Sequence, residues 1–324
     1  MQTRMLGRTG LTVSVLGLGC GAVGGLMVRG SPADQERVVA RALELGVTYF
    51  DTAPAYGDGQ SESNLGRVLA RLKPTLLLGT KLRLQVEEKS HIAQAIVAGM
   101  DASLRRLGRD HVDLYQLHNP ITHDGTDQAL TPRMVLEEVV PAFQALRSQG
   151  KTRFLGITAV GETAALHELV ASGAFDTAQV CYNMLNPSVA GPLPPHYPAQ
   201  DYGRLLERMQ ETKMGAIGIR ALAGGALTGM ATRHPIASPP PSPIGSGPDY
   251  AADLQRAGLF QALVDEHYAD SLAEAAFRFA IGNPSIGTTL IGIASVEQFD
   301  AAAAAVAKGP LSPAALARLQ DLTS

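Results

Sequence analysis

The alternation of short apolar runs with longer amphipathic segments limits the possible folds of this chain more than any other feature. Eight apolar runs have the composition of strands, and each is followed by a segment with helical periodicity. Strands separated by helices run parallel, because a parallel pair needs a long crossover connection. Runs that are apolar at nearly every position are typical of strands covered on both faces. The expected strands are 16–19, 47–51, 75–81, 112–118, 153–158, 177–182, 215–220 and 288–293.

Eight such units in 324 residues predict one domain over residues 1–324, a closed (β/α)8 TIM barrel. An open doubly wound sheet usually has fewer strands and is followed by a second domain. Two short alternating runs within residues 1–16 predict a β-hairpin ahead of the barrel. Residues 186–200 and the proline-rich residues 231–249 interrupt the alternation. We interpret both as long loops on the C-terminal face, although the second could also be a linker between domains.

Several positions have residues that are typical of helix starts. Ser31-Pro32 and Thr131-Pro132 each combine an N-cap residue with proline at the first helical position. Ser61 and Ser90 are expected to cap the second and third helices. Pro141 lies inside a helical pattern, which predicts a kink there because proline removes a helix hydrogen bond.

Charge and hydropathy exclude several classes of function. The net charge is −3, so no broad basic surface for nucleic acid or an anionic membrane is implied. The N-terminus lacks the apolar core of a signal peptide, and no apolar run approaches the roughly 18 residues of a membrane span. Cys20 and Cys181 lie in apolar contexts without metal-ligand spacing. We therefore expect a cytoplasmic protein, and its oligomeric state stays open.

Polar side chains gather where the predicted strands end. Asp51 ends the second strand with Tyr56 just beyond it, Lys81 ends the third, and His118 ends the fourth. Each has a plain structural explanation by itself: a helix cap, turn packing, a solvated strand edge and a satisfied core histidine. In a closed parallel barrel, however, all of these ends lie on one rim. The four residues together predict a catalytic site.

These residue types suit proton transfer. A buried Lys81 ammonium needs a carboxylate partner, which Asp51 can provide, and it favours the phenolate form of a neighbouring Tyr56. Such a tyrosine serves as general acid for a carbonyl oxygen or general base for an alcohol, and His118 can donate a hydrogen bond to that oxygen. None of these four residues is a strong nucleophile, and the sequence shows no metal-ligand pattern. The missing reagent is then a hydride from a bound cofactor.

A glycine motif offers a competing interpretation. Gly19 to Gly24 fits G-x-G-x-x-G after a strand, as in a Rossmann dinucleotide site. The motif does not open a helix, because residues 26–30 intervene before Ser31-Pro32, and eight strand–helix units do not suit that fold. We favour a role in which Gly21 and its neighbours let the backbone pass close to a ligand at the first strand end.

Five segments carry a resemblance to one enzyme family. They are the opening hairpin Leu6–Ser14, Phe50–Gly57 with its Asp-Thr-Ala…Tyr-Gly pattern, Asp113–His118, Gln179–Asn183 and Leu222–Gly229. The chain resembles the aldo-keto reductases almost from end to end. The resemblance implies a (β/α)8 barrel and an oxidoreductase that uses NADP or NAD on a small carbonyl or alcohol substrate. Its catalytic residues would be Asp51, Tyr56, Lys81 and His118.

The resemblance also implies a cofactor site. Gln179 would hold the nicotinamide carboxamide, and residues after Arg220 and Ile291 would hold the phosphates. The full set of expected cofactor contacts is Gly21, Asp51, Thr158, Gln179, Arg220, Leu222, Gly224, Gly292, Ser295 and Gln298.

Two departures from the family pattern leave alternatives open. Ala159 cannot make the hydrogen bond of the family's asparagine. The positions that match the family's NADP contacts after the eighth strand, Gly292, Ile293, Gln298 and Ala302, offer no cation for a 2′-phosphate. NAD or dual use is therefore expected as readily as NADP. An aldose or polyol dehydrogenase working toward oxidation with NAD, and a cofactor-binding regulatory subunit with little turnover, are the competing functions.

Overall fold

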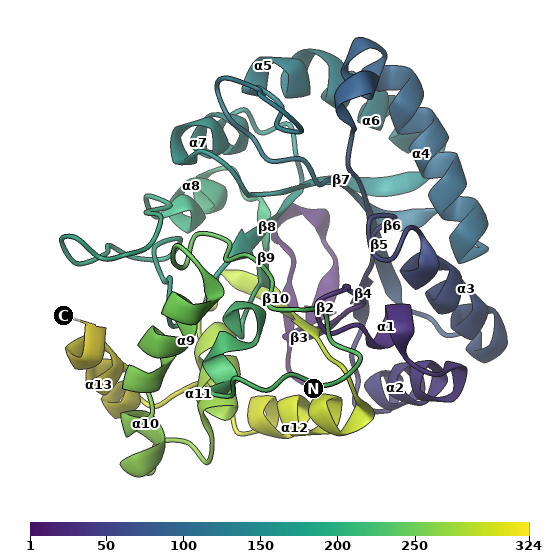
Figure 1. Ribbon diagram of the computed structural model, residues 1–324. Helices are drawn as coiled ribbons and strands as arrows, with labels where there is room; N and C mark the ends of the chain where they lie inside the picture. The colour runs from purple at the N-terminus through teal and green to yellow at the C-terminus, as the bar shows by residue number, and fades with distance from the viewer. Residues whose placement is uncertain (324) are drawn as a thin grey trace.

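The computed structural model describes residues 1–323, and its centre is a closed barrel of eight parallel strands in the order β10-β3-β4-β5-β6-β7-β8-β9 (Figure 1). This confirms the predicted (β/α)8 architecture. The barrel strands are β3 Leu16–Gly19, β4 Tyr49–Asp51, β5 Leu77–Leu82, β6 Val112–Leu117, β7 Thr152–Thr158, β8 Thr177–Cys181, β9 Gly215–Ile219 and β10 Ile286–Gly292.

Helices surround the barrel, and most connect one strand to the next. Short α1, Leu26–Arg29, lies in the connection after β3 and was not predicted. The remaining helices are α2 Pro32–Glu44, α3 Gln60–Leu72, α4 Ile92–Leu107, α5 Pro132–Met134, α6 Val140–Ser148, α7 Thr163–Ala171, α8 Leu205–Glu211, α9 Tyr250–Leu259, α10 Ala262–Asp265, α11 Leu272–Ala280, α12 Val296–Ala307 and α13 Pro313–Thr323.

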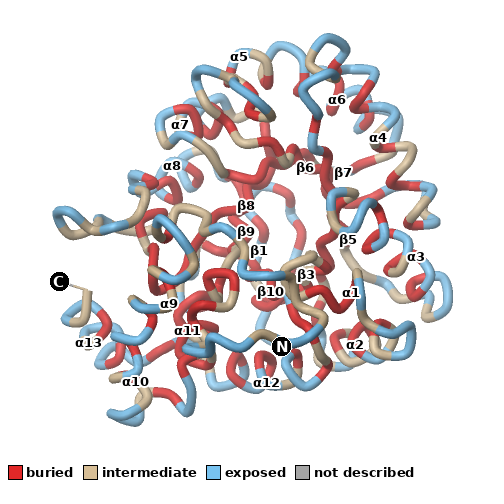
Figure 2. The backbone as a smooth tube through the Cα atoms, viewed as in Figure 1, coloured by how far each residue is buried: buried red, intermediate tan, exposed pale blue. Residues whose placement is uncertain are grey.

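The barrel wall is buried on both sides. The strands are buried along most of their length, while the outer faces of the helices are exposed (Figure 2). On α3, for example, Leu65, Val68 and Leu69 form one apolar stripe that packs inward. Among residues 1–323, no helix has the length and apolarity to cross a membrane.

The helix starts were predicted with mixed success. Ser31 and Thr131 cap α2 and α5, because their hydroxyls accept the backbone N–H three residues on. The expectations for Ser61 and Ser90 were wrong. Gly59 is the N-cap of α3, and a short 3-10 helix, Val86–Ser90, precedes α4. The Ser61 hydroxyl is instead used in a buried contact with the barrel.

Pro141 lies at the start of α6, directly after a π-helical turn, Val135–Val139. The irregularity therefore falls in the turn before the proline. Proline lacks the N–H that would bond four residues back, and a widened turn absorbs that missing hydrogen bond.

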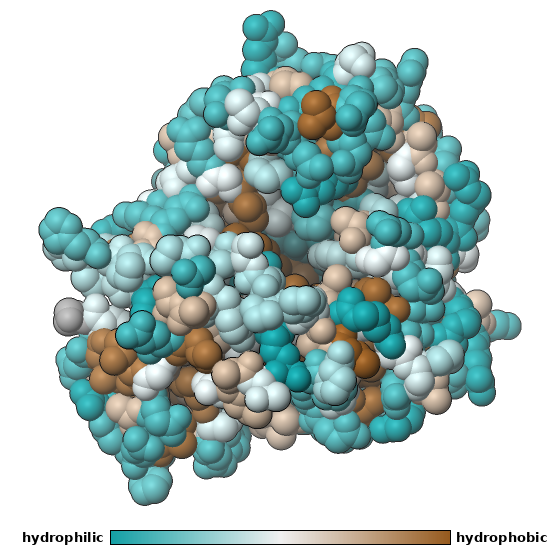
Figure 3. Space-filling model, in the orientation of Figure 1, coloured by the Kyte–Doolittle hydropathy of each residue, from teal (hydrophilic) through white to brown (hydrophobic). Residues whose placement is uncertain are grey.

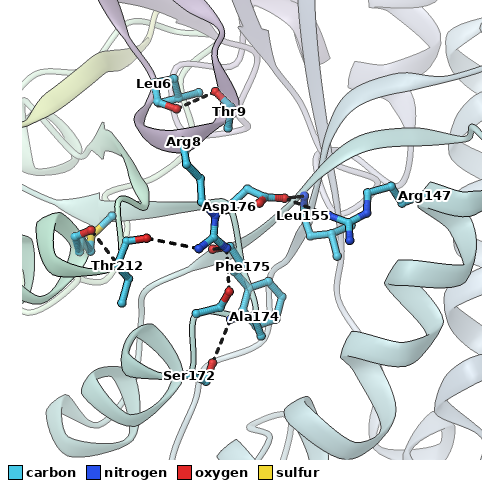
Figure 4. Close-up of polar contacts among 12 residues, drawn as sticks. Leu6, Arg8, Thr9, Arg147, Leu155, Ser172, Ala174, Phe175, Asp176 and Thr212 are labelled. Carbon is cyan, nitrogen blue, oxygen red and sulfur yellow. Dashed lines mark hydrogen bonds and ion pairs between the residues drawn. The ribbon is translucent and has the colours of Figure 1, made fainter.

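An N-terminal hairpin, β1 Thr3–Met5 and β2 Thr12–Ser14, closes the end of the barrel where the strands begin. Between its strands, Arg8 donates to the backbone oxygens of Gly173, Phe175 and Thr212 and to the Asp176 carboxylate (Figure 4). The second Asp176 oxygen accepts the Leu155 N–H at 3.0 Å. This polar network fastens the hairpin to the barrel floor.

The two long loops lie at the opposite end, where the strands finish. Asn186 Nδ2 and Gln200 N both donate to the Gly245 oxygen, at 2.7 and 2.9 Å. At its other end the proline-rich segment contacts the loop after β3, because Arg29 Nε donates to the Ile236 oxygen at 2.7 Å. Residues 231–249 are therefore a loop across the C-terminal rim, as predicted.

Candidate active site

The structure brings the four predicted catalytic residues together at the C-terminal rim. Asp51 ends β4, Lys81 lies near the end of β5, and His118 directly follows β6. Tyr56 lies in the connection between β4 and α3. Its hydroxyl is 3.2 Å from Lys81 Nζ, and its ring meets His118 edge to face with centroids 5.9 Å apart.

Lys81 is fully buried and uses all three of its donors. Its ammonium forms an ion pair with the Asp51 carboxylate and donates to the Thr52 oxygen at 3.0 Å and to the Tyr56 hydroxyl. Burial by itself lowers the pKa of Lys81, but the charge of Asp51 and the two side-chain hydrogen bonds outweigh it, so the pKa lies above its ordinary value. The ammonium is therefore charged and directed at the phenol.

The second Asp51 oxygen is held by three donors that come from inside the barrel. Tyr49 OH, Gln116 Nε2 and Gln179 Nε2 lie 2.9, 3.0 and 2.8 Å from it. Burial and the charge of Asp51 keep the pKa of Tyr49 well above its ordinary value, so this phenol remains a donor. The carboxylate is thus fixed in position beside the Lys81 ammonium.

The sequence reasoning missed Tyr49 and Gln116. The available signal was strand alternation, because each lies two residues before a residue of the site and so on the same side of its strand. Gly79 makes room for the cluster, since a Cβ there would lie 2.1 Å from the Tyr49 hydroxyl oxygen.

His118 is a neutral imidazole. Burial and the neighbouring charges of Lys81 and Arg83 lower its pKa to about 3. Its buried Nδ1 has no hydrogen-bond partner within residues 1–323. A neutral ring beside Tyr56 can donate one hydrogen bond without competing with Lys81 as a source of charge.

Polar atoms beside this cluster fit a carboxamide. Thr158 and Gln179 are register partners on β7 and β8. Thr158 Oγ1 is buried without a hydrogen-bond partner in the described chain. Gln179 gives its amide nitrogen to Asp51, which leaves its oxygen as the free acceptor. A hydroxyl and an amide oxygen side by side match the donor and acceptor of a carboxamide group. Gly21 lies against Tyr56, where a Cβ would be 3.8 Å from the ring.

The connection after β9 fits an anionic group. Arg220 adopts a left-handed backbone, φ 59°, and its guanidinium has no hydrogen-bond or ion-pair partner in residues 1–323. Gly224 also has a positive φ, 72°, and a Cβ there would lie 3.0 Å from Arg220 Nη1 and 2.7 Å from Pro241. Leu222 accepts the Gly225 N–H at 2.8 Å and so closes this turn. An unpaired cation therefore lies on a tight turn that the proline-rich loop covers.

The residues predicted after β10 form a local cap. Ser295 begins α12 and accepts the Gln298 N–H, while the Gln298 side chain accepts the Ala294 N–H at 2.8 Å. Gly292, the last residue of β10, is exposed just before this cap. Two arginines of α2 reach this helix but are paired with its carboxylates: Arg37 with Glu297 at 3.4 Å and Arg41 with Asp300 at 2.7 Å.

Figure 3 shows a hollow near the middle of the face in view, bordered by mixed polar and apolar side chains. The rim residues described above surround the barrel axis. A ligand entering along this axis would meet Tyr56 and His118 before the buried Lys81.

The chain matches known proteins in both sequence and fold. The family model "Aldo/keto reductase family" matches residues 15–324. An L-galactose dehydrogenase of Arabidopsis thaliana is 29% identical over 314 residues, covering 94% of this chain and 88% of that protein. An NADH-specific methylglyoxal reductase of Escherichia coli is 29% identical over 213 residues, 60% of this chain and 63% of that protein.

The solved structure of aldo-keto reductase AKR11C1 from Bacillus halodurans, in its holo form, has the same fold. Its TM-score is 0.74 at 24% identity, and the match covers 100% of this chain and 97% of that one. The family match begins directly after β2 and extends through all eight barrel strands. The chain belongs to the aldo/keto reductase family and is an NAD(P)-dependent oxidoreductase.

Proposed function

We propose that this oxidoreductase transfers hydride between NAD and a small hydroxylated carbonyl compound such as an aldose, with Tyr56 as the general acid and base. The contact that supports this proposal most is the one between Lys81 Nζ and the Tyr56 hydroxyl, with Asp51 behind the ammonium. A fully buried cation in contact with a partly buried phenol is an arrangement for moving a proton at the phenol oxygen.

The roles of the four side chains follow from their hydrogen bonds. Lys81 donates to the Tyr56 oxygen, so the phenol proton is free to point toward a carbonyl oxygen above it. After Tyr56 gives up that proton, the Lys81 charge stabilises the phenolate that remains. In the oxidative direction the same phenolate takes the proton of an alcohol. The bound nicotinamide supplies or accepts the hydride.

His118 orients the substrate oxygen in this scheme. Because its ring is neutral, it donates a hydrogen bond without giving up a proton to solvent across the working pH range. Its edge-to-face contact fixes its place beside the Tyr56 ring.

The cofactor contacts divide between three parts of the rim. Thr158 and the Gln179 oxygen would hold the carboxamide, beside Asp51, and Gly21 leaves space near Tyr56 for the nicotinamide ring. Arg220, with the backbone at Leu222 and Gly224, would hold the phosphates. The adenosine would lie toward Gly292, Ser295 and Gln298.

We favour NAD over NADP as the natural cofactor. A 2′-phosphate needs a free cation, and the arginines beside α12, Arg37 and Arg41, are already paired with carboxylates. Glu297 adds a negative charge next to Gln298 at the helix start. The E. coli relative whose name specifies NADH supports the same choice.

The substrate class comes from the relatives. The L-galactose dehydrogenase aligns over nearly the whole chain, and the methylglyoxal reductase acts on a small dicarbonyl compound by its name. We also place the reaction in the cytoplasm, which suits the buried free thiols Cys20 and Cys181.

Cofactor titration followed by substrate assays tests this function. Binding of NADH and NADPH is measured by fluorescence, and turnover is then measured with a panel of aldoses, aldehydes and polyols. We expect NADP(H) to be favoured over NAD(H) by no more than about tenfold, a difference of about 1.4 kcal/mol. A thousandfold preference for NADPH contradicts the cofactor proposal. Tight cofactor binding without turnover of any panel member contradicts the catalytic one.

A further inference from the structure

A second ion pair, between a buried carboxylate and a partly exposed arginine, lies outside the barrel wall, next to the strand that carries Lys81. Glu62, in the first turn of α3, is fully buried, and its Oε2 accepts from both Nε and Nη2 of Arg106 on α4 at 2.6 Å. Its other oxygen, Oε1, accepts from the Thr80 hydroxyl at 2.6 Å. Thr80 is the strand neighbour of Lys81 on β5. One carboxylate therefore joins α3 and α4 to the strand that carries the catalytic lysine.

The start of α3 has a further attachment to the rim. The Ser61 hydroxyl donates to the Cys20 oxygen at 2.8 Å and lies 2.9 Å from the Thr52 hydroxyl. The Ser61 N–H bonds to the Tyr56 oxygen at 3.2 Å. The chain between Thr52 and Ser61, which carries Tyr56, is thus anchored at its C-terminal end to the residues that directly follow β3 and β4.

Glu62 adds the link that sets this segment against β5. The Tyr56–Lys81 contact joins two separate chain segments, the β4–α3 connection and β5. Through Thr80, Glu62 ties the start of α3 to β5 one residue away from Lys81. The aliphatic part of Arg106 packs on Gly59, where a Cβ would lie 2.6 Å from the arginine Cδ. The arginine of the ion pair therefore also contacts the end of the segment that carries Tyr56.

Stability alone does not explain a charge in this place. Burying a carboxylate costs free energy, and apolar residues of similar volume often replace a buried ion pair at no loss of stability. What an apolar side chain cannot do is fix the helix start to one strand position by directed hydrogen bonds. We propose that Glu62 is a positioning residue that keeps Tyr56 within hydrogen-bond distance of Lys81. This inference rests on the proposed role of Tyr56.

The test compares Glu62→Ala with Glu62→Gln and with a matched control. Glu62→Gln retains both links, because its amide oxygen can accept from Arg106 while its nitrogen donates to the Thr80 hydroxyl. Asp176→Ala is the control, since it also removes a largely buried, arginine-paired carboxylate, but at the barrel floor. For each variant, kcat, cofactor Kd and the unfolding midpoint are measured.

We expect Glu62→Ala to lower kcat by about tenfold to hundredfold, because small misplacements of reacting groups cost that much. Its cofactor Kd should stay within about twofold of the parent value, and Glu62→Gln should recover most of kcat. Asp176→Ala should lower the unfolding midpoint while leaving kcat nearly unchanged. An equal loss of kcat in Glu62→Ala and Asp176→Ala, or full kcat in Glu62→Ala, overturns the inference.

Thr80→Val gives a milder variant that decides the question where Glu62→Ala does not fold. It removes only the link to β5 and should lower kcat in the same direction with cofactor Kd unchanged, whereas full kcat overturns the inference. Tyr56→Phe separates this inference from the proposed function. If Tyr56→Phe keeps full turnover, the proposed catalytic role of Tyr56 is wrong. If Tyr56→Phe loses turnover but Glu62→Ala keeps full kcat, only the positioning role of Glu62 is wrong.

Discussion

The two ends of the barrel each hold a buried carboxylate paired with a cation, but they use the pair differently. At the floor, Asp176 accepts from Arg8 and from the Leu155 N–H, and the remaining Arg8 donors end on backbone oxygens. At the rim, Asp51 pairs with Lys81, and the remaining Lys81 donors reach the Thr52 oxygen and the Tyr56 hydroxyl. Arg8 otherwise donates only to backbone oxygens, whereas Lys81 also donates to the hydroxyl of a side chain, Tyr56.

The rim also retains hydrogen-bonding capacity that the protein itself leaves unused. Within residues 1–323, Thr158 Oγ1 and His118 Nδ1 are buried without partners, and the Arg220 guanidinium is unpaired. Unsatisfied buried groups cost stability, and a ligand bound at the rim would supply the partners that these groups lack. We therefore expect the floor to contribute to stability and the rim to contribute to binding and proton transfer.

Lys81→Met should have the largest effect, and it should affect both stability and turnover. The substitution leaves Asp51 as a buried carboxylate without its cation, which costs about 3–5 kcal/mol. It also removes the charge that stabilises the Tyr56 phenolate, so kcat should fall by about 10²–10⁴-fold. Chemical denaturation and steady-state kinetics measure the two effects. Near-normal turnover in a folded Lys81→Met protein contradicts the rim assignment.

Asp176→Ala should affect stability only. Its removal leaves the Leu155 N–H without an acceptor and Arg8 without its carboxylate, at a cost of about 1–3 kcal/mol. Because the floor lies at the opposite end of the barrel, kcat and cofactor Kd should be unchanged. A large drop in kcat with intact cofactor binding would show that the two ends are coupled and that the contrast drawn above is wrong.

His118 should make the rim sensitive to acid in a defined window. Its pKa is about 3 in the folded protein and near 6.5 when unfolded. Because the folded pKa is the lower one, the neutral ring contributes stability that is fully present above pH 6.5 and is lost as the pH falls toward 3. Unfolding midpoints of the parent and of His118→Gln, followed across this range, measure the effect. The same pH dependence in both proteins would contradict it.

Arg29→Ala should have the smallest effect and should act on the rim loop. It removes one of two hydrogen bonds that hold residues 231–249 against the connection after β3, the one to the Ile236 oxygen, while the bond from Ser238 N to the Val23 oxygen stays. We expect faster proteolysis within this loop and cofactor release a few-fold faster, with cofactor protecting the loop in the parent protein. Arg133→Ala, which removes an exposed arginine from a surface ion pair with Glu137, is the control. Cleavage that does not respond to cofactor speaks against a role of the loop in enclosure.

The parts of the site that the sequence predicted are those set by strand order and strand ends. Asp51, Lys81 and His118 could be placed on one rim because eight parallel strands put all their carboxyl ends together. The fold followed from the same count. These inferences need only local periodicity and the rule that parallel strands require crossovers.

Other features depend on contacts between distant segments, and these contacts could not be predicted from the sequence. The Arg8–Asp176 pair joins residues 168 positions apart, and the Glu62–Thr80–Arg106 cluster joins two helices and a strand. The N-cap of α3 was misassigned because serine is a residue type that often caps helices. The Ser61 hydroxyl is instead held by the Cys20 oxygen, a tertiary contact that overrides the local preference.

The most direct measurement of the central claim is turnover and cofactor binding of Tyr56→Phe in one preparation. The substitution removes only the hydroxyl that Lys81 contacts and leaves the ring that packs against His118. The account predicts a cofactor Kd close to that of the parent and a kcat lower by about 10²–10⁴-fold, because the proton donor is lost. A Tyr56→Phe protein with undiminished kcat would contradict the assignment of proton transfer to this side chain.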